Sequence, residues 1–289
     1  MTHENINIPF GGKNNAVLTL YIPYLLQKSP VQRRPTVLIS PGGGYRLVSV
    51  REGDCIALKF LTYGYNAAVL TYSTNEDAQF PQPLCEEALA MAFLKEHAEQ
   101  YHIDPDRIFT CGFSAGAHLA LSLGVFWDQD WLSKKVGKAK ELLRPAAQII
   151  CYPLVSTDPE LLHADCTMVM MGKEDTPERR ELVSLEKQIT VNTPPTFLWT
   201  TLDDKIVSCE HSMVLANALH KKGVPVEFHL YGWGRHGLSL ANRITQARHL
   251  QNLPLKDNQI NPHIATWLPL CHEWLEEMIG TEILPQENP

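Results

Sequence analysis

Short apolar runs alternate along the chain with longer segments whose apolar residues recur at helical spacing. Residues 16–22, AVLTLYI, alternate with a period of two, which predicts an early antiparallel strand. Residues 54–64 instead carry a stripe of Ile56, Phe60 and Tyr63, which predicts a helix that stops at a glycine. Further strands are predicted over residues 36–40, 66–73, 108–111, 146–153, 194–201 and 226–232, and further helices over residues 81–101, 115–124, 212–222 and 265–279.

This alternation of strand and helix predicts the α/β fold class, with a mostly parallel sheet covered by helices on both faces. A chain of 289 residues suits one large α/β domain or two small ones, and we expect one domain over residues 1–289. Residues 104–107, DPDR, are predicted as a turn. Residues 158–191 break the alternation, because they combine methionines, a charged run and no clear strand. We expect this segment to be a lid-like insertion that partly covers the functional site.

The composition narrows the range of partners. The formal net charge of -7 and the absence of clustered Lys and Arg argue against nucleic acid and anionic membranes. Residues 1–12 lack the basic and apolar regions of a secretory signal, and no apolar run approaches the length that spans a bilayer. The seven scattered cysteines contain no C-x-x-C pair and suit reduced thiols, so a cytoplasmic location is expected.

A serine between two glycines marks the junction of the strand at 108–111 and the helix at 115–124. GFSAG, residues 112–116, matches the G-x-S-x-G nucleophile elbow. The pattern alone is weak, since it occurs by chance in roughly one chain in ten of this length, and the strand-to-helix context gives it weight. Flanking glycines leave room for neighbouring backbone, and the helix N-terminus favours a developing oxyanion. Ser114 is therefore predicted as a nucleophile, against the alternative of a serine in a plain turn.

A serine hydroxyl becomes a strong nucleophile only when a base takes its proton. In elbow enzymes an acid and then a histidine follow the serine along the chain. The strand end TLDDKIV offers Asp203 and Asp204; the spacing to the following Ile-Val favours Asp204, and the choice stays open. His236 lies in the glycine-bracketed loop GRHGL after the last predicted strand, and it is the expected base. The alternative for His236 is a surface histidine without a role.

The glycine run in SPGGGY predicts a source of backbone N–H groups for an oxyanion hole. Elbow enzymes take one N–H from the residue after the nucleophile, here Ala115, and others from a glycine-rich loop of the HGGG kind. Gly43 and Gly44 are the expected loop donors, and Pro41 stands where that loop has histidine. A phosphate cradle is the other interpretation, but neither G-x-G-x-x-G nor G-K-[ST] follows.

Together these segments resemble the α/β-hydrolase family over nearly the whole chain. Within it, the chain resembles the bacterial carboxylesterase branch described as acetyl-xylan-esterase-like or BD-FAE-like, related to hormone-sensitive-lipase-type esterases. The resemblance is carried by SPGGGY, GFSAGAHLA, CYPLVS, TPPTFLWTTLDDKIV and GWGRHGLSL. It implies Ser114 as nucleophile, Asp204 as acid and His236 as base. The D-x-x-V-P of the family becomes DKIVS here, so Ser208 replaces its proline.

Residues beside these motifs are candidates for substrate contact. Tyr45 and Arg46 follow the oxyanion loop, and with Tyr72 and Phe113 they are expected to line the acyl pocket; plain packing is the equal alternative. His118, four residues past the serine, also matches the branch. Its two interpretations are a site residue and a helix residue bonded to nearby backbone.

The predicted function is a serine esterase for small, short-acyl esters, because the chain has no large apolar cap domain to hold a long acyl group. A sugar acetate is the substrate that the resemblance implies. Two rivals stay open: a prolyl-oligopeptidase-like serine peptidase and a catalytically inactive hydrolase fold used for binding. No cofactor is expected, and no metal either, because H-E-x-x-H and tight His/Asp clusters are absent. The oligomeric state stays open between a monomer and a homodimer.

Overall fold

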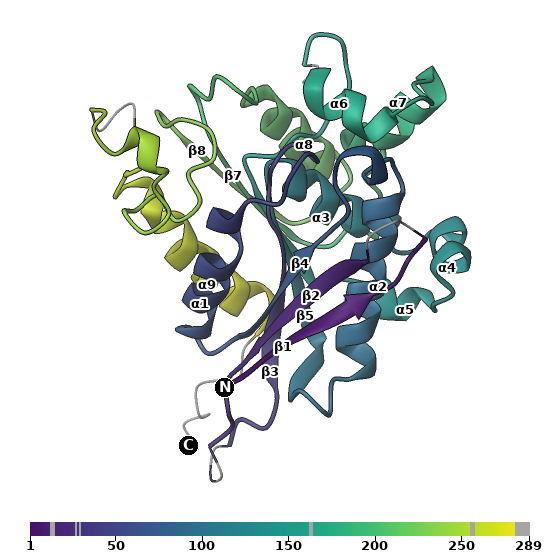
Figure 1. Ribbon diagram of the computed structural model, residues 1–289, viewed down its shortest axis with the longest axis vertical. Helices are drawn as coiled ribbons and strands as arrows, with labels where there is room; N and C mark the ends of the chain where they lie inside the picture. The colour runs from purple at the N-terminus through teal and green to yellow at the C-terminus, as the bar shows by residue number, and fades with distance from the viewer. Residues whose placement is uncertain (12–14, 27, 29, 162–163, 255–257, 281–289) are drawn as a thin grey trace.

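The central feature of the computed structural model is a twisted sheet flanked by helices (Figure 1). The structure describes residues 1–11, 15–26, 28, 30–161, 164–254 and 258–280. The strand order within these residues is β1-β2-β4-β3-β5-β6-β7-β8. The strands are β1 (Thr2–Ile8), β2 (Ala16–Ile22), β3 (Arg34–Ser40), β4 (Asn66–Thr71), β5 (Ile103–Phe113), β6 (Ala147–Cys151), β7 (Thr196–Thr201) and β8 (Val226–Tyr231).

Most of the sheet is parallel. β2 pairs antiparallel with both β1 and β4, and every other pairing, from β4 through β3 to β8, is parallel. The α/β class with a mostly parallel sheet is therefore confirmed. Because the parallel strands share one direction, their carboxyl ends lie along one edge of the sheet, where ligands bind in folds of this type.

Helices cover both faces of the sheet, as Figure 1 shows. The α-helices are α1 (Asp54–Leu61), α2 (Gln82–Glu96), α3 (Ala115–Phe126), α4 (Asp130–Val136), α5 (Lys140–Leu143), α6 (Ala164–Met171), α7 (Pro177–Val183), α8 (Glu210–Lys221) and α9 (Trp267–Ile279). Single turns of 3-10 helix are η1 (Val50–Glu52), η2 (Asn75–Asp77), η3 (Leu185–Lys187), η4 (Arg248–Leu250) and η6 (Ile264–Thr266).

The sheet separates two apolar cores. Alternate residues of one strand enter different cores: Leu38 belongs to the core that contains residues of α2, α3 and α8, whereas Val37 and Ile39 belong to the core that contains residues of α1 and α9. All twelve residues of α3 are buried, so this helix lies at the centre of its layer. A strand with both faces covered reads as a continuous apolar run, which is why the central strands were predictable from their letters.

Several elements differ from the sequence prediction. β1, α4 and α5 were not predicted, and β5 begins at Ile103 instead of 108. The predicted turn at 104–107 lies inside β5, where the register with β3 shifts, and the Asp104 carboxylate accepts the Asp106 N–H at 3.0 Å. This local carboxylate turn is accommodated as an irregularity in the strand, so the chain does not reverse there.

The segment 158–191 contains two helices that the sequence pattern did not predict, α6 and α7. Residues 162–163 of this segment lie outside the described residues. Figure 1 shows both helices at one end of the molecule, beyond α3. The buried His118 of α3 anchors the end of α7, because its Nε2 lies 2.9 Å from the Val183 carbonyl oxygen. Movement of the segment as a lid stays a prediction.

Candidate active site

Ser114 occupies the sharp turn between β5 and α3. Its φ of 54° and ψ of −118° lie outside the regions that residues with a side chain usually adopt. A Cβ atom at Gly112 would lie 2.2 Å from the Gly116 carbonyl oxygen, and one at Gly116 would lie 2.0 Å from the Ser40 carbonyl oxygen. Both glycines are therefore required by the close approach of strand, helix and β3, which holds the serine in its strained conformation.

A chain of hydrogen bonds joins Ser114, His236 and Asp204. His236 follows β8 and Asp204 follows β7, so the loops at the carboxyl ends of two neighbouring strands supply them. His236 Nε2 lies 2.8 Å from Ser114 Oγ, and His236 Nδ1 lies 2.6 Å from Asp204 Oδ2. Because a carboxylate only accepts, Nδ1 carries the proton and Nε2 accepts from the serine hydroxyl. This arrangement places a base against the hydroxyl of Ser114.

The two aspartates of the β7 loop have different surroundings. The Asp204 side chain is 1% exposed, and its second oxygen accepts two backbone N–H groups of its own loop, at 2.8 and 3.1 Å. Asp203 is exposed, and its carboxylate accepts the Gly234 N–H at 2.6 Å. Asp204 is thus the aspartate that contacts His236, while Asp203 fixes the loop that carries the histidine.

Backbone N–H groups gather beside the serine. Gly43 and Gly44 line the cavity that contains Ser114, with φ values of 131° and 65°. A Cβ atom at Gly43 would lie 2.0 Å from a carbonyl oxygen of the same loop. Among the hydrogen bonds described for the chain, the N–H groups of these two glycines have no acceptor. Ala115 opens α3, where the first N–H groups have no partner within the helix.

A buried carboxylate that the sequence analysis missed ties these parts together. Glu52 is 3% exposed, and one oxygen accepts the Gly42 N–H at 2.9 Å while the other accepts the Tyr152 hydroxyl at 2.6 Å. The same Tyr152 oxygen accepts the Ser239 N–H at 3.0 Å, and its ring lies edge-on to His236, with centroids 5.2 Å apart. Burial raises the pKa of Tyr152 well above its usual value, so the phenol stays a donor to Glu52.

The cavity at the serine has two lobes. The first, of about 260 Å³, is lined by Ser114 and the glycine loop, and on its other sides by Leu47, Cys166 and Ile206. The second has a volume of about 520 Å³. It extends from His236 along the loops that follow β7 and β8, as far as Leu253 and Gln259. Arg51, Ile206, His236 and Gly237 line both lobes. Cys166 belongs to α6, so the segment 158–191 contributes one wall of the site.

The four expected substrate contacts do not line either lobe. Tyr45 and Tyr72 are 3% exposed, and their hydroxyls are hydrogen-bonded to His118 Nδ1 at 2.9 Å and to a backbone carbonyl at 2.6 Å. Phe113 is fully buried in the core that contains residues of α1 and α9, because successive side chains of a strand alternate between the two faces of the sheet. Arg46 is exposed and lines neither lobe. The structure corrects the prediction that these four line an acyl pocket.

His118 follows its helix-residue interpretation. It is 1% exposed and bonded to Tyr45 through one nitrogen and to the Val183 carbonyl through the other. Burial lowers the pKa of His118 to about 4, so the ring is neutral at physiological pH. Its contacts join α3, the oxyanion loop and α7, and it does not line the cavity at Ser114.

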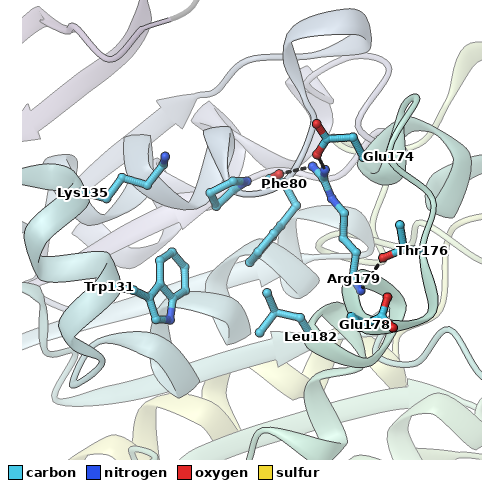
Figure 2. A pocket seen from close by; sticks show the side chains of 9 residues that line it. Phe80, Trp131, Lys135, Glu174, Thr176, Glu178, Arg179 and Leu182 are labelled. Carbon is cyan, nitrogen blue, oxygen red and sulfur yellow. Dashed lines mark hydrogen bonds and ion pairs between the residues drawn. The ribbon is translucent and has the colours of Figure 1, made fainter.

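A larger cavity, of about 650 Å³, lies apart from the serine between α4, α7 and the start of α2. Figure 2 shows Phe80, Trp131 and Leu182 forming its apolar wall and Arg179 bound to Glu174 at its rim. None of its lining residues belongs to the hydrogen-bonded group around Ser114.

Within the described ranges, no group of three or more His, Cys, Asp or Glu side chains is placed to hold a metal ion. No helix in that same part of the chain is both long enough and apolar enough to cross a membrane.

Known proteins share both the sequence pattern and the fold. A family model described as BD-FAE matches residues 20–219. Endo-1,4-beta-xylanase B of Butyrivibrio fibrisolvens is 38% identical over 213 residues, which cover 73% of this chain. The chain spans only 33% of the length of that relative.

Two crystal structures extend the likeness to the whole chain. MGS-M1, an alpha/beta hydrolase enzyme from a Medee basin deep-sea metagenome library, is 32% identical, with 97% of this chain and 99% of that chain covered and a TM-score of 0.76. The acetyl ester-xyloside bifunctional hydrolase from Caldicellulosiruptor lactoaceticus is 29% identical, with coverages of 96% and 97% and a TM-score of 0.78. The expected α/β-hydrolase fold is confirmed.

Proposed function

The chain belongs to the BD-FAE family of α/β-hydrolase proteins, and from that premise we propose that it is a serine-dependent carboxylic ester hydrolase for short-acyl esters. The observation that carries the proposal is the continuous hydrogen-bonded series from Ser114 Oγ through His236 to Asp204, with distances of 2.8 and 2.6 Å. A nucleophile, a base and an orienting acid in this relation are what acyl transfer requires.

The first step is attack on the ester carbonyl carbon. Ser114 Oγ forms the new C–O bond while its proton moves to His236 Nε2. Asp204 holds the Nδ1 proton of His236 and stabilises the imidazolium that results, without taking the proton itself. Because Asp204 is sealed from water and His236 is 16% exposed, the acid is fixed and the base can be reached by substrate.

The second requirement is stabilisation of the tetrahedral oxyanion. The N–H groups of Gly43, Gly44 and Ala115 are the donors in this proposal, and the N-terminus of α3 adds its dipole. Collapse of the intermediate releases the alcohol with the proton from His236. A water molecule then attacks the acyl-serine by the same route, with His236 again as base, and the acid product leaves.

The size of the first lobe supports a short acyl group. About 260 Å³ lies between the oxyanion loop and the side chains of Leu47, Cys166 and Ile206, below the range typical of pockets for drug-sized ligands. An acetyl group fits this space. Since a structural relative is named for hydrolysis of an acetyl ester and a xyloside, we propose acetylated sugars as the first natural esters to test.

Hydrolysis of p-nitrophenyl acetate, butyrate and octanoate by the wild type and by Ser114→Ala tests the proposal. We expect kcat/KM to fall from acetate to octanoate, and the variant to lose roughly a thousandfold or more of the wild-type rate. Ser133→Ala is the matched control, because Ser133 lies in α4 and its hydroxyl donates to the Lys138 carbonyl, away from the cavity at Ser114.

Equal rates of p-nitrophenyl ester hydrolysis by the wild type and Ser114→Ala would contradict the proposal. Cleavage of peptides without cleavage of esters would instead favour a serine peptidase. Acetate release from acetylated xylo-oligosaccharides is the second measurement, made only with protein that passes the first.

A further inference from the structure

The second lobe of the site adjoins His236. It is lined by His236 and Gly237 but not by Ser114, Gly43 or Gly44. In acyl transfer the alcohol oxygen must receive its proton from the imidazole, so the alcohol part of an ester lies beside the histidine. With about 520 Å³, this lobe is twice the size of the one at the serine. If the protein is the proposed ester hydrolase, the second lobe is where the alcohol part is recognised.

Cations dominate the charged groups that line this lobe. Among the described residues that line it are Arg51, Lys205 and Arg235, against one carboxylate, that of Asp203, which already accepts the Gly234 N–H at 2.6 Å. This excess of positive charge stands in a chain whose formal net charge is -7. A local field opposite in sign to the whole molecule favours a bound anion.

Two hydrogen bonds hold the guanidinium of Arg51 in place. Its Nε donates to the Thr245 carbonyl at 2.5 Å and one terminal nitrogen donates to the Gly237 carbonyl at 2.7 Å. None of the ion pairs among the described residues involves Arg51, which is only partly exposed. A partly buried guanidinium held by two neutral carbonyls is not paired with a counter-ion and loses little freedom on binding, so it suits an oxyanion ligand.

We propose that this lobe binds an oxyanion group, a carboxylate or a phosphate, carried by the alcohol part of the ester, with Arg51 as the main contact and Lys205 in support. The inference rests on the proposed ester hydrolysis. It adds a substrate class: short-acyl esters of anionic alcohols, such as acetylated acidic sugars, are preferred over their neutral analogues. Arg51 lines both lobes, so it also fixes how far the anion lies from the reacting carbonyl.

The test uses three acetates of one phenol that differ only in a remote group. These are 3-(4-acetoxyphenyl)propionate, the corresponding phosphonate and the neutral propionamide, whose phenol leaving groups are matched. We expect kcat/KM to be roughly tenfold higher for the anionic acetates than for the amide, mainly through KM. The preference falls as salt is raised, because the lobe is open to solvent. The two anionic arms distinguish a carboxylate ligand from a phosphate-like one.

Substitutions then identify the contact. Arg51→Gln is expected to abolish most of the preference, Arg51→Lys to retain part of it, and Lys205→Gln to reduce it by a smaller factor. The ratio of anionic to neutral turnover is the readout, since a general disturbance of the His236 loop lowers both rates together. Lys221→Gln is the matched control: it removes one positive charge at the exposed end of α8, which runs back toward the opposite edge of the sheet.

Equal kcat/KM for anionic and neutral acetates, or an unchanged ratio in Arg51→Gln, overturns the inference. The proposed function still stands in that case, provided that hydrolysis depends on Ser114. If the protein shows no hydrolysis that depends on Ser114, the proposed function itself is overturned. Calorimetric binding of 3-(4-hydroxyphenyl)propionate and its amide to Ser114→Ala tests the anion preference without turnover. Tighter binding of the acid supports the inference, and equal binding overturns it.

Discussion

At the scale of single residues, one buried carboxylate connects the two halves of the site. Glu52 holds the Gly42 N–H and the Tyr152 hydroxyl with its two oxygens. The hydrogen bond to Gly42 connects Glu52 to the glycine loop, and the one to Tyr152 connects it to the loop of His236. Both halves of the site are therefore positioned by one side chain that touches no reacting atom.

Replacing Glu52 tests this positioning role. We expect Glu52→Ala to lower kcat for p-nitrophenyl acetate by roughly tenfold to a hundredfold, because the Gly42 N–H loses its acceptor and the oxyanion donors shift. Glu52→Gln keeps an acceptor and should recover a large part of kcat. Thermal unfolding of both variants is the companion measurement. A glutamine variant as slow as the alanine variant, at equal stability, would contradict a role for this hydrogen bond.

Residue identities at the site were predictable to the extent that the motif and chain order expose them. Ser114 carries its own glycine signature, and His236 follows the last strand in the expected order. Glu52 and Tyr152 were not predictable, because they lie 100 positions apart and neither has a local signal. The burial of Tyr45 and Tyr72 was equally hidden, since a tyrosine beside a glycine loop can face the cavity or the core, and tertiary packing decides.

At the scale of elements, close packing fixes the position of α3. Its Gly116 touches the backbone of β3 closely enough that a Cβ atom would lie 2.0 Å from the Ser40 carbonyl oxygen and 2.4 Å from that of Pro41. The helix is buried over its whole length. A displacement of α3 would therefore move Ser114, which immediately precedes the helix, relative to β3 and the glycine loop that follows it.

We expect Gly116→Ala to destabilise the fold by roughly 3 kcal/mol, because the added methyl group forces α3 away from β3. Chemical denaturation gives the free energy of unfolding, and ester turnover at a temperature where the variant is folded gives the effect on the site. Gly232→Ala is the control, because nothing lies within 4 Å of its Cβ position; its change should stay within about 0.5 kcal/mol. Similar losses at the two positions would contradict the packing argument.

Elements were predictable where the apolar residues of their own sequence determine their burial. The central strands are apolar on both faces, so their runs were plain, and β2 was found with its bounds unchanged. β1 was missed because THENINI offers only two apolar residues and gains its order by pairing with β2. α6 and α7 were missed because long-range contacts, such as that of His118 with Val183, help to fix their place.

At the scale of the whole molecule, a buried charge links stability to pH. Glu87 of α2 is fully buried, and burial raises its pKa to about 8, with the Ser40 hydroxyl offsetting only part of the rise. The folded protein therefore keeps this proton up to about pH 8, whereas the unfolded chain loses it near the usual value of about 4.3. Unfolding releases a proton between these values, so raising the pH favours the unfolded state.

Glu87→Gln should remove this dependence. Between about pH 6.5 and about pH 8 the wild type is expected to lose about 2 kcal/mol of unfolding free energy that the variant keeps. The window avoids His118, whose pKa of about 4 makes stability rise with pH only below its unfolded value of about 6.5. Denaturant titrations at both pH values measure the difference. Parallel pH dependence in the two proteins would show that Glu87 is ionised in the folded state.

The spacing of the hydrogen-bonded residues Ser114, Asp204 and His236 along the chain has a consequence for the order of folding. Ser114 and His236 are 122 positions apart, and Asp204 and His236 are 32 apart. The elbow and its glycines belong to β5 and α3, but the loop of His236 is fixed only once β8 has joined β7 at the far end of the sheet. Contacts between such distant positions form late, because ordering the intervening chain costs conformational entropy. During refolding we therefore expect the turn that carries Ser114 to form before the loop of His236, so that recovered turnover reports the pairing of β8 with β7.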